Sequence, residues 1–420
     1  MKRKVFFFMA PFWGHITPNL YFLEVLSLKY DVVCFCGEKF RGILKHQCAV
    51  FVPYPEILQE TYISTGVVTE DIEKAARQYY STQYEEDAME LNCAIEVRRA
   101  RLAMSELAPY VEEYAPTLIL MDSIITFPVI LAEKYTIPYI LVEEGTYQVF
   151  GEVDLYREYL ENVVSKEINQ LLDYDEINIS KLKIKKRILR RYGEFLGNSQ
   201  NAKNFEITPR CSIAFSSENL QIQSDFLRKD EHLLGFHMDV GQTVEKENRI
   251  FVTRGTLSDA YNVSLLKCIA ETFIGHPYKV TVTCGSMIDK NDIMTDSLRA
   301  APNIEIKNMV NQIAELKRSR VMVSHGGITG VREAIMCETP VIIFPNNYQG
   351  YQVGTALEKY NAGIMLREHP FSKEELRRAI STVLGDSRYR KHVCQLCEEL
   401  LAYSKERITI PYIESLFQNT

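Results

Sequence analysis

Short apolar runs alternate with longer amphipathic stretches along the chain, and this rhythm strongly limits the folds it can adopt. In the first half the apolar runs lie at residues 4–10, 31–37, 117–122 and 137–143. Such runs are typical of strands buried on both faces of a parallel sheet, and the stretches between them have helical spacing. This βαβ order predicts a doubly wound open α/β sheet, whose ligands bind beyond the carboxyl ends of the strands.

A second series of apolar runs follows a polar stretch. Its members are residues 249–256, 278–285, 304–308, 320–327 and 339–345. Because 420 residues exceed what one hydrophobic core usually organises, we expect two Rossmann-like domains that face each other across a cleft. The predicted divisions are an N-terminal domain at 1–236, a linker at 237–248, a C-terminal domain at 249–400 and a tail at 401–420 that packs back on the first domain.

Residues 145–205 depart from the βαβ rhythm, because they are charged, Tyr-rich and helical in pattern. We interpret them as a helical insertion that shapes a substrate pocket in the first domain. Within it, the basic run at 181–191 is either a solvated helix face or a patch that attracts an anionic lipid or acceptor.

The net charge of -7, from 48 basic and 55 acidic residues, argues against a nucleic-acid surface. The apolar run near the N-terminus is too short for a signal peptide and lacks a small-residue cleavage site, so it is better interpreted as a buried first strand. No stretch approaches the roughly 20 apolar residues of a membrane span. The ten cysteines are scattered, and Cys394 and Cys397 have no second ligand pair nearby. We therefore expect a cytoplasmic protein that needs no metal and does not span a membrane.

The segment from 320 to 335 contains a turn suited to an anion. Gly326 and Gly327 allow close backbone approach where a strand gives way to a helix, and the helix start offers unpaired N–H groups. His325 can donate to the same phosphate oxygens, and Glu333 can accept hydrogen bonds from the hydroxyls of a ribose. The alternative is a turn whose glycines serve tight packing alone.

A similar turn, Arg254-Gly255-Thr256, follows the first strand of the second series, and its Thr256 can cap a helix or contact a phosphate. In the first domain, His15 and Asp122 each follow a strand. An aspartate on one imidazole nitrogen would orient the ring and leave the other nitrogen to accept a proton. A structural role for His15 and a helix N-cap role for Asp122 are the alternatives.

These residues together resemble the GT-B glycosyltransferases of family 1, which use UDP- or TDP-sugars and small-molecule acceptors. The resemblance rests on "GHITP" after the first strand, on Asp122, on "VTRGTL" and "NMVNQ", and on the stretch from His325 through Glu333 to Pro345. It implies an inverting displacement with His15 as the general base and Asp122 as its partner. It also implies a set of donor-binding residues: Thr256, Met309, Val310, Gln312, His325, Gly326, Gly327, Thr329, Gly330, Glu333 and Gln349.

Several positions depart from the family pattern. Gly330 stands where a serine is expected, and Thr329 is the candidate to replace its hydroxyl contact to phosphate. Met309 replaces the aromatic residue that stacks on the base. The acidic–Gln pair that holds sugar hydroxyls is Gln349-Gly350, which carries no charge. We therefore expect altered sugar contacts, as for an amino, deoxy or N-acetyl sugar.

The leading hypothesis is a natural-product type of glycosyltransferase whose partners are a nucleotide sugar, as co-substrate, and a small acceptor with a hydroxyl group. One alternative is a catalytically silent homologue that acts as a binding or activating partner. Another is a nucleotide-sugar epimerase on the same fold.

Overall fold

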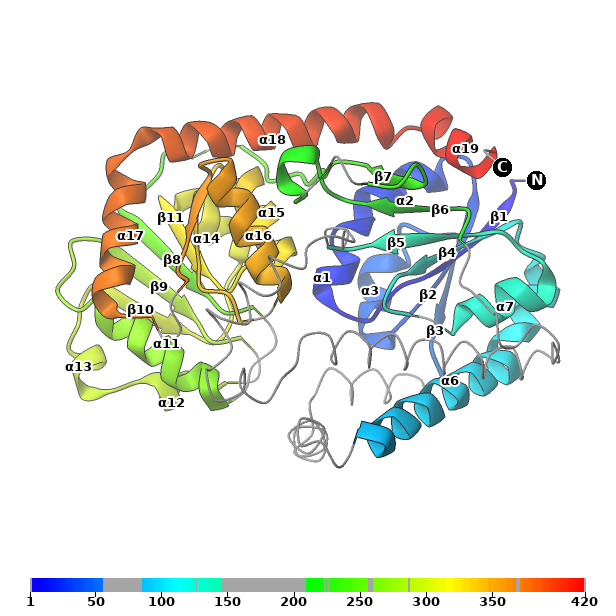
Figure 1. Cartoon of the computed structure of the whole chain (residues 1–420), viewed down its shortest axis with the longest axis horizontal. Helices are drawn as coiled ribbons and strands as arrows, with labels where there is room; N and C mark the ends of the chain where they lie inside the picture. The colour runs from blue at the N-terminus through cyan, green and yellow to red at the C-terminus, as the bar shows by residue number, and fades with distance from the viewer. Residues whose placement is uncertain are drawn as a thin grey trace.

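The computed structural model describes residues 2–55, 85–125, 127–145, 209–222, 224, 227–242, 244–255, 260–285, 288–346, 348–367 and 371–418. These residues form two α/β domains, each built on a parallel sheet (Figure 1). This confirms the predicted doubly wound architecture. Residues 146–205 of the predicted insertion, with its basic run, and Thr256 lie outside the described residues.

The first sheet has seven parallel strands in the order β3-β2-β1-β4-β5-β6-β7. They are β1 (Lys4–Phe8), β2 (Asp31–Cys36), β3 (Val50–Pro53), β4 (Leu118–Asp122), β5 (Tyr139–Glu143), β6 (Cys211–Ala214) and β7 (Glu231–Leu233). Side chains of β1 alternate between the two faces, as a strand requires. Phe7 packs on Phe22 of the helix layer on one face, whereas Phe8 stacks on Phe35 on the other.

The second sheet has six parallel strands in the order β10-β9-β8-β11-β12-β13. They are β8 (Arg249–Thr253), β9 (Lys279–Thr283), β10 (Ile304–Lys307), β11 (Val321–Ser324), β12 (Val341–Ile343) and β13 (Gly363–Met365). In both sheets the chain starts near the middle, extends to one edge and then returns to build the other half. The order therefore reverses beside β1 and beside β8, and ligands of open sheets bind at such points.

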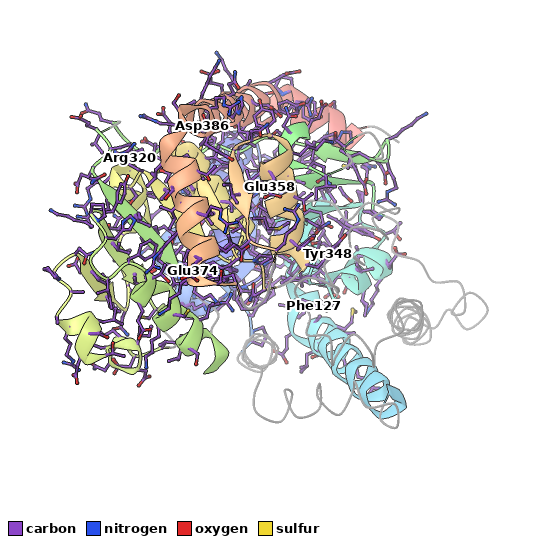
Figure 2. The ribbon with its side chains drawn as sticks, turned by 60° about the vertical axis from the view of Figure 1, so that its left-hand side comes forward. Phe127, Arg320, Tyr348, Glu358, Glu374 and Asp386 are labelled. Carbon is purple, nitrogen blue, oxygen red and sulfur yellow. The ribbon has the colours of Figure 1, made fainter. Side chains whose placement is uncertain are left out.

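Helices cover both faces of each sheet (Figure 1). In the first domain they are α1 (Trp13–Ile16), α2 (Asn19–Ser27), α3 (Arg41–Leu44), α6 (Glu85–Tyr114) and α7 (Pro128–Tyr135), with 3₁₀ turns η1 (Glu38–Phe40) and η3 (Glu218–Leu220). In the second domain they are α11 (Ala260–Thr272), α12 (Lys290–Ile293), α13 (Asp296–Arg299), α14 (Gln312–Arg318), α15 (Ile328–Met336), α16 (Tyr348–Lys359) and α17 (Lys373–Gly385). Figure 2 marks α16 with Tyr348 at its first turn and Glu358 at its last, and α17 with Glu374 near its start.

Two further helices, α18 (Ser387–Arg407) and α19 (Ile410–Gln418), carry the chain from the second domain back to the first (Figure 1). The carboxylate of Asp386 caps α18 at its N-terminus, and the helix then runs without a break past residue 400. Its Leu400 carbonyl accepts a hydrogen bond from the Phe236 amide, and Arg407 donates to the Leu233 carbonyl at 2.7 Å. The predicted domain boundary at residue 400 thus falls inside a continuous helix.

Helix α15 joins the two domains through apolar packing. One continuous cluster of buried side chains runs from the first sheet through α15 to the second sheet. Ile328, Val331 and Ile335 of α15 belong to this cluster, together with Ile16 and Phe215 of the first domain. The helix that follows the predicted anion-binding turn is therefore also a major contact between the domains.

Candidate functional site

His15 and Asp122 meet at the carboxyl edge of the first sheet. Strands β1 and β4 are parallel neighbours, with Phe8 opposite Met121, so the residues that follow them emerge at the same edge. Asp122 ends β4, and His15 lies in the short helix α1 just after β1. The His15 Nδ1 and Asp122 Oδ2 atoms are 2.7 Å apart. The structure thus brings together the two residues that the sequence singled out for catalysis.

The surroundings of Asp122 fix its carboxylate in place. Oδ1 accepts a hydrogen bond from the Ile124 amide at 3.1 Å, and the Ala10 amide approaches Oδ2 at 3.4 Å. Helix α7 begins later, with Phe127 at its N-cap, so Asp122 does not cap it. In the tautomer whose Nδ1–H donates to this carboxylate, Nε2 has a lone pair that can accept an incoming proton. The ring of His15 remains partly exposed, at 23% of its side-chain surface.

Two residues that the sequence did not identify stand behind this pair. Asn19 donates from Nδ2 to the His15 carbonyl at 2.8 Å and also to the Glu144 carboxyl group. Burial, reinforced by the charge of Asp122, raises the pKa of Glu144 well above its usual value. Asn19 follows His15 by four residues and Glu144 follows the end of β5. These two positions, one helical turn after His15 and one residue after a strand end, are the sequence features that could have identified Asn19 and Glu144.

His15, Asp122 and Glu144 are also the one group of described residues whose possible ligand atoms all lie within 4.8 Å of one another. Metal ions bind deprotonated carboxylates, and burial favours the protonated form of Glu144. His15 and Asp122 are already hydrogen-bonded to each other. This donor set fits a proton-transfer pair better than a metal centre.

The predicted diphosphate turn lies between β11 and α15, and its backbone is closely packed together with the turn that follows β8. Gly255 and Gly326 have positive φ angles of 77° and 88°. A Cβ atom at Gly255 or at Gly327 would lie 2.8 Å from the ring of His325, so both glycines leave room for the imidazole. A Cβ at Gly326 would lie 2.9 Å from the Cα of Gly350. These glycines therefore allow close packing within the turn as well as access for a ligand.

His325 is neutral and has an unsatisfied ring nitrogen. Burial, with the nearby charge of Arg254, lowers the pKa of His325 to about 3. Its Nδ1 is buried and has no hydrogen-bond partner among the described residues. A buried polar atom without a partner is costly, so it indicates a missing partner such as a ligand. A neutral imidazole that donates one N–H to a phosphate oxygen fits this position.

Glu333 and Gln312, both predicted to contact the nucleoside, are brought together. Gln312 Nε2 donates to Glu333 Oε2. Burial raises the pKa of Glu333, whereas the bond from Gln312 and the charge of Arg332 oppose the shift. A Cβ at Gly330 would lie 3.4 Å from the Gln312 amide nitrogen, so a side chain there would be in van der Waals contact with this pair. The carboxylate is preorganised and keeps further acceptor capacity for hydroxyl groups.

The remaining predicted donor residues have different surroundings. Met309 is 59% exposed in the loop after β10, and Val310 packs against the core. Gln349 is exposed in the first turn of α16, and its amide lies against Gly145 of the first domain. The hydroxyl of Thr329, which was predicted to contact phosphate, donates to the Gly14 carbonyl at 2.9 Å. It lies on the side of α15 that faces the first domain.

A cavity of about 500 Å³ lies elsewhere in the second domain. Arg320 and Asp386, both labelled in Figure 2, are among its lining residues, and Lys246 of the predicted linker is another. None of the predicted site residues lines it.

In the part of the chain that the structure describes, no helix has the length and apolar character needed to cross a membrane.

Comparison with protein families and curated proteins points to glycosyltransferases. Residues 249–395 match the model of the glycosyltransferase family 28 C-terminal domain. An uncharacterised UDP-glucosyltransferase of Bacillus subtilis, YojK, is 26% identical over 162 residues, which are 38% of this chain and 38% of that protein. The NDP-glycosyltransferase YjiC of the same organism is 22% identical over 412 residues, which cover 92% of this chain and 90% of YjiC.

Solved structures share the fold over the whole chain. The glycotransferase of kitacinnamycin has a TM-score of 0.71 at 18% identity and covers 99% of both chains. The spinosyn rhamnosyltransferase SpnG complexed with thymidine diphosphate has a TM-score of 0.63 at 14% identity, over 95% of this chain and 96% of that one. At these identities the likeness shows the fold alone. That fold is the two-domain GT-B fold, and the match of the second domain and the likeness of nearly the whole chain to YjiC are both similarities to glycosyltransferases.

Proposed function

We propose that this protein is an inverting glycosyltransferase that moves a sugar from a UDP- or TDP-sugar to a hydroxyl group of a small-molecule acceptor. The observation that carries the proposal is the 2.7 Å contact between His15 Nδ1 and Asp122 Oδ2, which leaves Nε2 free of that bond. The relatives support a nucleotide-sugar donor, since they include UDP-glucosyltransferases and a structure complexed with thymidine diphosphate.

In the proposed reaction the acceptor oxygen attacks the anomeric carbon of the sugar in a single displacement. The new carbon–oxygen bond forms as the bond to the diphosphate breaks, and the diphosphate leaves with the electron pair. His15 Nε2 takes the acceptor proton, and Asp122 stabilises the imidazolium that results. Attack from the face opposite the leaving group inverts the anomeric configuration.

Charge that develops on the leaving diphosphate is proposed to be stabilised at the amino end of α15. The helix start supplies N–H groups and a positive dipole end, and His325 supplies an N–H donor. Arg254 adds positive charge close to His325. With these groups in place we propose that no metal ion takes part, so addition of a chelator should leave the rate unchanged.

Gln349 and Gly350 are proposed to select the sugar. The exposed Gln349 amide can donate and accept hydrogen bonds, but the pair offers no carboxylate to sugar hydroxyls. We therefore propose a donor other than plain glucose, such as an amino, deoxy or N-acetyl sugar. The same uncharged pair favours the alternative of a silent homologue, in which the site binds a nucleotide and does not turn it over.

The test begins with a panel of UDP- and TDP-sugars scored by thermal stabilisation, followed by turnover with candidate hydroxyl acceptors. His15→Gln should reduce kcat by roughly 10²–10⁴-fold, the usual contribution of a general base. His46→Gln is the matched control, because His46 is exposed in the same domain. Full activity of His15→Gln would exclude it as the base. Stabilisation without turnover would favour the silent homologue, and conversion of a donor without an acceptor would favour an epimerase.

A further inference from the structure

Helix α15 makes a direct hydrogen bond to the segment that carries His15, the proposed base. The Thr329 hydroxyl donates to the carbonyl of Gly14, the residue before His15, at 2.9 Å. A Cβ at Gly14 would lie 3.5 Å from this hydroxyl oxygen, which is an ordinary van der Waals distance. The first turn of α15 thus contacts Gly14, the residue before His15, and directly follows the predicted diphosphate turn.

Arg332, one turn further along α15, reaches into the first domain. It is fully buried, and no other fully buried side chain among the described residues is larger. Its guanidinium donates to the Phe215 carbonyl and to the Glu144 carbonyl, each at 2.6 Å, and lies over the ring of Phe236. The two carbonyls directly follow β6 and β5, so Arg332 bridges the carboxyl ends of two strands in the opposite domain.

The arginine is more than a packing residue. Burial lowers the pKa of Arg332 to about 10, which still leaves it charged at neutral pH, and the nearby Glu144 opposes the shift. A buried cation costs free energy that an apolar side chain of equal size would avoid. Such groups are useful where a contact must have one geometry, and two planar hydrogen bonds to fixed carbonyls impose that geometry.

A continuous set of contacts then leads from Arg332 to the base. Arg332 holds the backbone of Glu144, the Glu144 carboxyl group accepts a hydrogen bond from Asn19, and Asn19 donates to the His15 carbonyl at 2.8 Å. Thr329 reaches the same segment from the other side through Gly14. Both routes start on the helix whose amino end is proposed to bind the diphosphate.

We propose that Thr329 and Arg332 are positioning residues that form a latch between the domains and couple diphosphate binding at the amino end of α15 to the placement of Gly14 and His15. The inference rests on the proposed function, because it requires a nucleotide diphosphate at α15. When the latch is intact, a bound nucleotide shifts the segment of the base; when it is broken, the nucleotide still binds but the segment does not respond. Such coupling is reciprocal, so an ordered base segment also favours the nucleotide.

The chain supplies its own probe, since its single tryptophan, Trp13, precedes Gly14. Trp13 is half exposed and packs edge-on against Phe40. UDP and TDP are titrated into the full-length protein, with calorimetry to measure binding and Trp13 fluorescence to report on the base segment. The variants are Thr329→Val, which keeps the side-chain shape, and Arg332→Lys, which keeps the charge but not the two-pronged contact.

Thr272→Val is the matched control, because the buried Thr272 hydroxyl donates to the Cys268 carbonyl within its own helix. We expect the parent and the control to bind nucleotide and to change Trp13 emission. Thr329→Val should bind nucleotide more weakly, by the factor of the lost coupling, and should lose the emission change at saturation, whereas Arg332→Lys should keep part of that change. Thermal unfolding of each variant separates a lost response from lost folding.

Different outcomes refute the proposed function and the latch. If the parent binds neither UDP nor TDP, the proposed function fails and the latch fails with it. If the parent binds nucleotide and Trp13 does not respond, or if Thr329→Val responds as the parent does at equal saturation, the latch is refuted and the proposed function stands.

Discussion

Lowering the pH should destabilise the second domain through His325. In the folded chain burial holds the pKa of His325 at about 3, whereas an exposed histidine titrates near 6.5. Below pH 6.5, and down to the pKa of the folded state, His325 is protonated in the unfolded chain and neutral in the folded chain. The contribution of neutral His325 to the free energy of unfolding is therefore fully present above roughly pH 6.5, and it is lost as the pH falls toward the pKa of the folded state.

The size of the effect follows from the two pKa values. Between about pH 6.5 and about pH 4.5 the unfolded histidine passes from half to almost fully protonated, and the free energy of unfolding drops by about 2 kcal/mol. His325→Gln removes this titration and keeps an N–H donor, so its stability should fall by about 2 kcal/mol less than that of the parent over the same range.

Urea unfolding followed by circular dichroism at each pH measures the difference, with His46→Gln as the control for an exposed histidine. Nuclear magnetic resonance of labelled histidines provides a direct second reading, and the His325→Gln spectrum identifies the missing signal. A His325 signal that titrates near pH 6.5, or equal pH slopes for parent and variant, would refute the argument. Bound UDP or TDP should raise the pKa of His325, since phosphate stabilises the imidazolium.

Three further predictions test the packing around the site. Gly255→Ala should lower the free energy of unfolding by about 1–3 kcal/mol. The loss should exceed that of Gly275→Ala, because both glycines have positive φ but only at Gly255 would the added Cβ meet His325, at 2.8 Å. Thermal unfolding compares the two variants. Glu333→Gln should weaken UDP or TDP binding about tenfold by calorimetry through loss of a charged acceptor, and unchanged affinity would remove it from the ribose site. Lys246→Met should lower the melting temperature more than Lys391→Met, since Lys246 donates to Leu316, Cys337 and Thr339 and Lys391 is exposed.

The sequence predicted that His15 and Asp122 lie close together, because it shows where the strands end. Residues 4–10 and 117–122 are unbroken apolar runs, and the topology of a doubly wound sheet makes neighbours of strands such as β1 and β4. A polar residue at the end of each run then has to meet the other. The same reasoning placed His325 in the turn after β11 and Glu333 on the helix that follows, α15.

Other features depend on contacts that sequence spacing does not carry. Strands β7 and β13 have three residues each, too few for a periodic pattern. Arg332 looks like an ordinary charged helix residue, and its burial follows from the docking of the two domains. Thr329 was predicted to contact phosphate because it precedes Gly330, yet its helix face points to the first domain.

Helix α18 has a mechanical consequence for the whole molecule. Its 21 residues span about 30 Å at the usual rise of an α-helix. It begins in the second domain, and its later turns are hydrogen-bonded to the first. A straight helix resists bending more than a loop does, so it acts as a strut along one side of the interface. Relative motion of the domains should then be a rocking about that strut, which opens the edge farthest from α18 and keeps the near edge closed.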